Sequence, residues 1–145
     1  MKLKVLAVIL SGIAFALVAT LIGFALYLLW SFVLPNVDGF YMTQAFRPFD
    51  HPLTIGLFLL PFIEGFIFAA FYSIFERLIA VRGAFAKGST YGLYLFILTS
   101  VPWLVLIYSL FDISVILFVM WTLESLVRYY LGCGVLAVVY EKFSK

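Results

Sequence analysis

The sequence predicts an all-α, polytopic membrane protein: a bundle of four transmembrane helices joined by short loops. Of its 145 residues, 66% are hydrophobic and only 11% are charged, and the mean hydropathy is +1.21. No soluble core needs so much apolar surface. Hydropathy picks out four apolar segments, each long enough to cross a hydrocarbon core about 30 Å thick. Such segments satisfy their backbone in lipid as helices, so we expect a single transmembrane domain over residues 1–145.

The first predicted helix covers about residues 5–34. It follows two lysines, as a secretory signal would, but its apolar run exceeds the roughly 7–15 residues of a signal peptide, so we expect an uncleaved helix. The second helix is predicted at about 53–80, the third at about 89–110 and the fourth at about 113–140. Asp112, in the short connection before the fourth helix, is the expected N-cap of that helix.

Basic residues predict which side of the membrane holds the termini. Seven of them flank helix ends that share one side: Lys2, Lys4, Arg77, Arg82, Lys87, Lys142 and Lys145. The opposite side holds only Arg47. Loops rich in Lys and Arg stay in the cytoplasm. We therefore expect a multi-pass protein of the cell membrane with both termini cytoplasmic.

The segment 35–52, PNVDGFYMTQAFRPFDHP, is the one long loop and lies on the predicted outer side. Its aromatic residues among polar ones favour a position at headgroup depth. The alternative is a partly re-entrant cover over a site between the helices, with contacts from Tyr41, Arg47, Asp50 and His51. Two adjacent ligands, Asp50 and His51, are a weak pattern for a metal site, so no metal is expected.

Small residues and prolines predict where helices approach and bend. Gly12 and Gly23 in the first segment, and Gly88 and Gly92 in the third, offer faces that permit close helix contact in lipid. We expect the polar stripe of the fourth helix to pack against these faces; its residues are Trp121, Glu124, Ser125, Arg128 and Gly132. Pro61 and Pro102 each remove a backbone hydrogen bond and predict a kink in the outer halves of the second and third helices.

Three ionisable residues lie inside the apolar segments: Glu64 in the second, and Glu124 with Arg128 in the fourth. Each glutamate is about 16 Å below the predicted outer end of its helix, close to the midplane. Thr99 of the third segment reaches the same level. Charged groups at this depth are costly and mark candidate functional sites. The sequence therefore predicts a midplane site formed by Glu64, Glu124, Arg128 and Thr99.

The charges of this site predict how it is paired. Glu124 and Arg128 are four residues apart on one helix with the acid first, a spacing that favours pairing. Two carboxylates and one guanidinium leave an excess of negative charge, and arginine stays protonated. We expect Glu124 to pair with Arg128, and Glu64 to hold a proton or cation exchangeably. Alternatively, the ionic groups fix the register of the helices and have no transport role.

Composition excludes several function classes. A single Cys and a single His exclude an intramolecular disulfide, a CxxC redox pair, Cys-based metal sites and a bis-histidine haem. Without a Ser–His pair or a glycine-rich phosphate loop, an enzyme is not favoured, and no cofactor or nucleic-acid partner is expected. We expect proton- or ion-linked transport of a small solute by an oligomer in the bilayer. The alternative is a non-catalytic subunit or assembly factor bound to another membrane protein.

Overall fold

A computed structural model describes residues 2–34, 55–111 and 113–144, and within these ranges the chain is helical, with no strand. Four stretches are long and apolar enough to cross a membrane: Lys4–Val33, Phe58–Leu78, Ala84–Leu110 and Val115–Ser144. The all-α class and the four candidate transmembrane helices predicted from the sequence are therefore confirmed.

The helical elements follow the four predicted segments but end at different residues. They are α1 (Lys2–Val33), α3 (Ile55–Phe75), a 3₁₀ turn (Glu76–Leu78), α4 (Ala84–Leu95), a π-helical turn (Phe96–Ser100), α5 (Val101–Leu110) and α6 (Val115–Ser144). The third span begins earlier than predicted, and the last continues further. Hydropathy detects the edge of the apolar region, whereas a helix continues through polar residues such as Lys87 and Glu141 wherever they can reach water.

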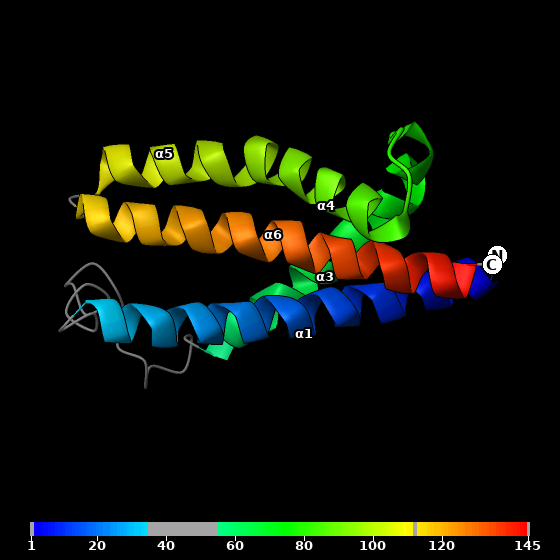
Figure 1. Ribbon diagram of the computed structural model, residues 1–145, viewed down its shortest axis with the longest axis horizontal. Helices are drawn as coiled ribbons and strands as arrows, with labels where there is room; N and C mark the ends of the chain where they lie inside the picture. Colours follow the sequence, from blue (N-terminus) through cyan, green and yellow to red (C-terminus); the bar gives the residue numbers. More distant parts are fainter. Residues whose placement is uncertain (1, 35–54, 112, 145) are drawn as a thin grey trace.

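The helix α6 is the centre of the bundle. It runs antiparallel to α1 along one side and to α4 and α5 along the other, while α3 crosses α1 (Figure 1). The start of α1 and the end of α6 lie together at one end of the bundle, which we call the terminal end. We call the opposite end, where α1 stops and α6 begins, the distal end.

Glycines set the two closest helix contacts. A Cβ added at Gly88 would strike the backbone carbonyl of Cys133, and one added at Gly92 would strike that of Tyr129, so α4 lies directly on α6. On the other side of the bundle, a Cβ at Gly65 would strike the carbonyl of Gly12, so α3 lies directly on α1. Because glycine has no side chain, the backbones can touch, and the close approach predicted for α4 is confirmed. The partner surface was predicted wrongly, since α4 lies on Tyr129 and Cys133 and not on the polar stripe of α6.

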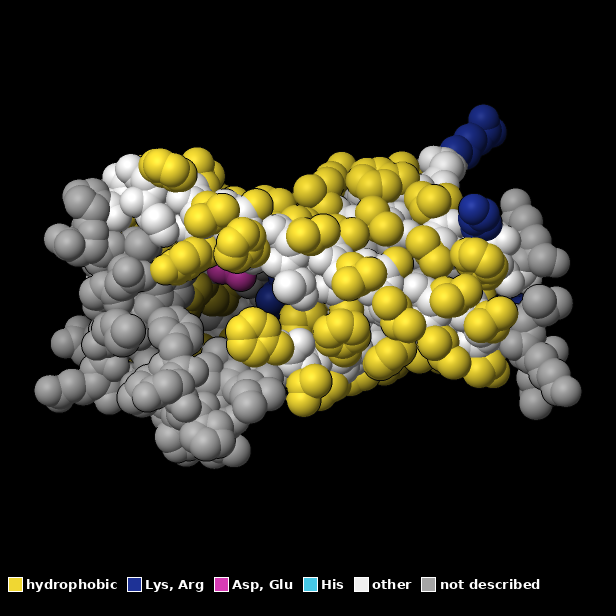
Figure 2. Space-filling view, turned by 90° about the horizontal axis from the view of Figure 1, so that it is seen from below, with side chains coloured by type: hydrophobic (Ala, Val, Ile, Leu, Met, Phe, Trp, Pro, Cys, Tyr) yellow, Lys and Arg dark blue, Asp and Glu magenta, His cyan; other side chains and the backbone are white. Residues whose placement is uncertain are grey.

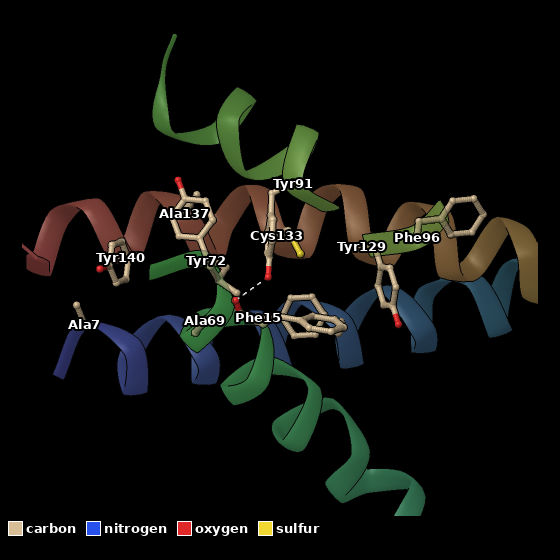
Figure 3. Close-up of a cluster of buried hydrophobic side chains, with 13 residues drawn as sticks. Ala7, Phe15, Ala69, Tyr72, Tyr91, Phe96, Tyr129, Cys133, Ala137 and Tyr140 are labelled. Carbon is tan, nitrogen blue, oxygen red and sulfur yellow. Dashed lines mark hydrogen bonds between the residues drawn. The ribbon is translucent and has the colours of Figure 1, made fainter. Parts of the chain in front are cut away.

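The core of the terminal half is aromatic. The Tyr72 ring packs edge-on against Tyr91 at a centroid distance of 5.4 Å and against Tyr140 at 5.5 Å. The Tyr91 hydroxyl donates a hydrogen bond to the Phe68 carbonyl at 3.0 Å, across from α4 to α3 (Figure 3). Edge-to-face packing and a satisfied hydroxyl favour one fixed arrangement of these helices.

The helix differs at the two prolines that were predicted to cause kinks, Pro102 and Pro61. In the third span, the π-helical turn comes directly before Pro102, and the Val101 N–H bonds to the Phe96 carbonyl, five residues back. Such wide turns relieve the crowding that a proline ring causes in the preceding turn. Pro61 lies within α3, which continues without interruption to Phe75.

Ser114 caps α6, which begins at Val115. The Leu117 N–H donates to the Ser114 hydroxyl oxygen at 3.2 Å, which is the bond of an N-cap residue. Asp112, the predicted N-cap, is outside the described residues.

We expect Ser114→Ala to lower the free energy of unfolding by about 1 kcal/mol, because one backbone donor of the first turn loses its acceptor. Thermal unfolding in detergent measures this loss.

Ser109→Ala is the matched control for the cap. The Ser109 hydroxyl is exposed and donates to the Val105 carbonyl at 2.7 Å within α5, a carbonyl that the helix backbone also uses. This control should leave stability almost unchanged. Equal losses in both variants would show that Ser114 has no capping role.

Candidate functional site

Arg128 forms its ion pair with Glu64, across the bundle from α6 to α3. The guanidinium Nη2 lies 3.4 Å from the carboxylate Oε2, and the two side chains are only 19% and 18% exposed. Among the described acids, Glu64 is the one within ion-pair distance of Arg128. The predicted pairing of Glu124 with Arg128 along α6 was therefore wrong.

The side chain of Glu124 instead reaches α1. Its Oε1 atom lies 3.4 Å from the position that a Cβ at Gly23 would occupy, so Gly23 leaves the room that this carboxylate uses. The positive charge of the Arg128 guanidinium also attracts the Glu124 carboxylate. The guanidinium thus lies between two carboxylates, one bonded to it from α3 and one nearby on its own helix. The i to i+4 spacing did not decide the pairing because the Arg128 side chain is long enough to reach the neighbouring helix.

The Glu64–Arg128 pair leaves hydrogen-bonding capacity unused. A charge-assisted hydrogen bond between these groups is usually about 2.7–2.9 Å long, and this contact is longer. Glu64 Oε2 and Arg128 Nε are both buried and have no hydrogen-bond partner within the described part of the chain. Buried polar atoms are almost always satisfied. One acceptor and one donor therefore remain for a polar occupant of the site, such as water.

Three aromatic rings lie next to the ion pair. Phe15 of α1 packs edge-on against Phe68 of α3 at 5.3 Å, and Phe68 packs edge-on against Tyr129 of α6 at 5.2 Å. The Arg128 guanidinium carbon is 5.7 Å from the centroid of the Tyr129 ring, a cation–π distance. Tyr129 also interacts with Glu64 through its hydroxyl. The charged site therefore borders a packed apolar layer.

The charged groups are reached from the surface through a hollow. Figure 2 shows a mostly apolar surface with a hollow toward the distal end, in which acidic and basic side-chain atoms are visible. The other described charged residues belong to the terminal end: Lys2, Lys4, Glu76, Arg77, Arg82, Lys87, Glu141 and Lys142. The visible charges therefore belong to the group Glu64, Glu124 and Arg128, which we call the charged site.

Thr99, the fourth predicted member of the midplane site, is not brought to the charged site. The Thr99 side chain is exposed, and its hydroxyl donates to the Leu95 carbonyl of its own helix at 2.7 Å. Tyr41, Arg47, Asp50 and His51 fall outside the described residues. Within residues 2–34, 55–111 and 113–144, no group of His, Cys, Asp or Glu side chains is arranged to hold a metal ion.

Two residues of the site were not predicted as members. Gly23 was recognised only as part of a small-residue stripe, and Tyr129 only as a packing residue. The stripe on α1 was the available signal for Gly23, because a glycine at that depth leaves space beside the fourth helix. Nothing in the sequence distinguishes Tyr129 from its neighbour Tyr130, since only the packing of α3 decides which ring faces Glu64.

No protein-family model, curated protein or solved structure matches this chain. The chemistry of the site is therefore read from its own residues. One guanidinium is ion-paired with one carboxylate, and a second carboxylate occupies the space beside a glycine.

Proposed function

We propose that the chain is a membrane transport protein in which the charged site binds a proton or small cation and couples it to a small solute. The observation that supports this proposal is the second carboxylate. Glu64 neutralises Arg128, so Glu124 adds a negative charge that no described ion pair compensates. An uncompensated charge in an apolar surrounding is costly. Binding of a proton or cation removes that cost, which makes Glu124 the exchanging group.

The three charged residues have different roles in this proposal. Glu64 holds Arg128 in place by the ion pair between α3 and α6. Arg128 keeps the affinity of Glu124 for its cation moderate, because its positive charge opposes a second positive charge nearby. A transport site must release what it binds, and a carboxylate beside a fixed guanidinium meets this condition. The sequence-based assignment of the exchanging role to Glu64 is replaced, because Glu64 is the ion-paired acid.

One observation favours a second candidate function. The ion pair joins α3 to α6, and these helices contact each other far less than α1 and α6 do. An ion pair at such a junction fixes how the helices are arranged. In this candidate, the chain is a non-catalytic subunit or assembly factor that binds another membrane protein, and no ion exchanges at Glu124.

The proposal includes the setting of the protein in the membrane. Arg77, Arg82 and Lys87 support a cytoplasmic position for the terminal end, since basic residues are retained on that side. Both termini are then cytoplasmic in the cell membrane. Four helices rarely enclose a pathway by themselves, so a second copy completes it. The proposed partners are lipid and this second copy, with no cofactor and no nucleic acid.

Ion flux into vesicles tests the transport proposal. The purified chain is reconstituted into liposomes that contain a pH-sensitive dye, and a potassium diffusion potential is imposed; Na⁺ uptake is followed separately. We expect flux above that of empty vesicles, and we expect Glu124→Gln to reduce it to the empty-vesicle rate, because the amide binds neither a proton nor a cation at that position.

Glu141→Gln is the control for general effects of removing a carboxylate. Glu141 is paired with Lys87 at the terminal end, at 3.8 Å, far from the charged site. This variant should retain wild-type flux. Flux that is equal in wild type and Glu124→Gln would refute the proposed role of Glu124. If the wild type carries no flux and co-purifies with another membrane protein, the subunit candidate replaces the transporter.

A further inference from the structure

We propose that Phe15, Phe68 and Tyr129 form a dry barrier that closes the charged site toward the terminal end, so that the site exchanges with the distal side alone. We call these three residues the aromatic barrier. This inference deepens the proposed transport function, since a site that couples two fluxes must not be open to both sides at once. The barrier itself is a matter of packing, and it can be tested without any transport measurement.

The aromatic barrier fills the middle of the bundle from three sides. Phe15 comes from α1, Phe68 from α3 and Tyr129 from α6, with centroid distances of 5.3 and 5.2 Å and interplanar angles of 82° and 85° along this series. Their exposed fractions are 0%, 7% and 4%. Rings packed edge-to-face at interior density leave no space for a water molecule between them.

Two glycine contacts hold the barrier closed. A Cβ at Gly132 would lie 2.8 Å from Phe15 Cε2, so the ring of Phe15 occupies the space over this glycine on α6. Gly65 follows Glu64 directly, and its contact with Gly12 brings α3 against α1 at the level of the barrier. Where the rings meet, α3 is therefore in backbone contact with α1, and the Phe15 ring of α1 lies directly on the backbone of α6.

The two sides of the barrier differ in packing. Toward the terminal end, the core continues with Ala69, Tyr72, Cys133, Ala137 and Tyr140, all 0% exposed (Figure 3). Toward the distal end, buried residues continue between α5 and α6, with Leu104, Leu117 and Met120, whereas no described residue of α1 from position 20 to position 34 is buried. The hollow of Figure 2 lies on this distal side. The access route of water and ions to the charged site is this hollow, and the packed core prevents passage beyond it.

The chain contains a natural reporter on the closed side of the barrier. Cys133 is the single cysteine of the sequence, is 0% exposed, and lies one helical turn beyond Tyr129 toward the terminal end (Figure 3). A thiol reacts with a water-soluble reagent only when the reagent and water can reach it. The rate at which Cys133 is modified therefore measures whether the barrier is open.

The first experiment compares this rate in barrier and control variants of the full chain in detergent. Phe68→Ala and Phe15→Ala remove a barrier ring, and Phe71→Ala removes a ring of α3 that is 48% exposed. A charged methanethiosulfonate reagent is added, and modification is followed by the mass of the intact chain. We expect Cys133 to be protected in wild type and in Phe71→Ala, and to react about ten-fold faster or more in both barrier variants.

Folding is checked so that unfolding is not mistaken for an open barrier. Helical content and gel-filtration profile are measured for each variant. If an alanine variant does not fold, Phe68→Leu is compared with Phe71→Leu, since leucine keeps most of the apolar volume and removes the ring edge. A folded barrier variant whose Cys133 stays as protected as in wild type overturns the proposal. Equal reactivity in the Phe71 control overturns it as well.

The charge of the reagent identifies the route to Cys133. A reagent that arrives from the distal side passes the charged site, where carboxylates outnumber the guanidinium. In Phe68→Ala, a cationic reagent should therefore react faster than an anionic one of the same size, and adding Glu124→Gln should reduce this preference. An unchanged preference would show that the reagent enters elsewhere, and the assignment of distal access would fail. These results do not depend on ion flux, so barrier and transport proposals can fail separately.

Discussion

Arg128→Gln is expected to lower the free energy of unfolding by about 3–5 kcal/mol, the range found when one partner of a buried ion pair is removed. The substitution leaves Glu64 without its ion-pair partner and Glu124 without the positive charge that attracts it. Both carboxyl groups would then lie in an apolar surrounding without a compensating charge, whether they stay ionised or take up a proton. The loss also weakens the contact of α3 with α6, which then depends on the ring contacts of Phe68 with Tyr129 and of Tyr72 with Tyr140. Thermal or dodecyl-sulfate-induced unfolding in detergent measures the effect.

Two controls separate this loss from the ordinary effect of losing a cation. Lys87→Gln breaks the pair with Glu141, which lies at the terminal end of the bundle, is 3.8 Å long and has side chains 25% and 29% exposed. A longer pair nearer to water is worth about 0–1 kcal/mol. The double variant Glu64→Gln with Arg128→Gln should be more stable than Arg128→Gln alone, because one of the uncompensated carboxylates is gone. If Arg128→Gln is no worse than Lys87→Gln, the ion pair contributes little to the fold.

The second large effect is expected where α4 lies on α6. Gly88→Ala and Gly92→Ala should each destabilise the protein by about 1–3 kcal/mol, the usual result of overpacking. The new Cβ at Gly88 would meet the Cys133 carbonyl and lie 2.5 Å from Ala137 Cβ, and that at Gly92 would lie 3.0 Å from Cys133 Cβ. Backbone atoms and a Cβ cannot rotate away, so α4 must move off α6. The same unfolding assay measures this loss.

Gly56→Ala is the matched control for these glycines. Gly56 is a helical glycine of α3, and an added Cβ there would have no atom within 4 Å. Alanine is the better helix former by about 1 kcal/mol, so this variant should be neutral or more stable. Destabilisation by Gly56→Ala equal to that at Gly88 would mean that backbone conformation, and not helix contact, explains the effect.

The four spans and the membership of the charged site were predictable from the sequence. Long apolar segments in water-excluding surroundings must be helical, and the depth of an ionisable residue follows from the helical rise along its segment. Glu64, Glu124 and Arg128 were therefore identified as one site before their positions in space were known. Thr99 satisfied the same depth argument and yet points outward, because depth says nothing about which side of a helix faces the bundle.

The pairing within the site was not predictable. Spacing along one helix favoured Glu124 as the partner of Arg128, but an arginine side chain can reach an acid on a neighbouring helix just as well. Which acid it meets depends on where α3 crosses, and that crossing is set by the contact of Gly65 with Gly12. Contacts of this kind join residues far apart in the chain, and no local pattern encodes them.

Composition and periodicity by themselves determined that this chain is a membrane-type helical bundle with charge at mid-depth. These are properties of single segments in an apolar solvent, so each can be predicted from the sequence of its own segment. The tertiary structure alone decided that Glu64 holds Arg128, that Gly23 makes room for Glu124, and that the aromatic barrier lies on one side of the site. The physical reason is that helix–helix contacts in lipid depend on close steric fit between two surfaces. This fit involves two helices at once, so the sequence of one segment does not predict it.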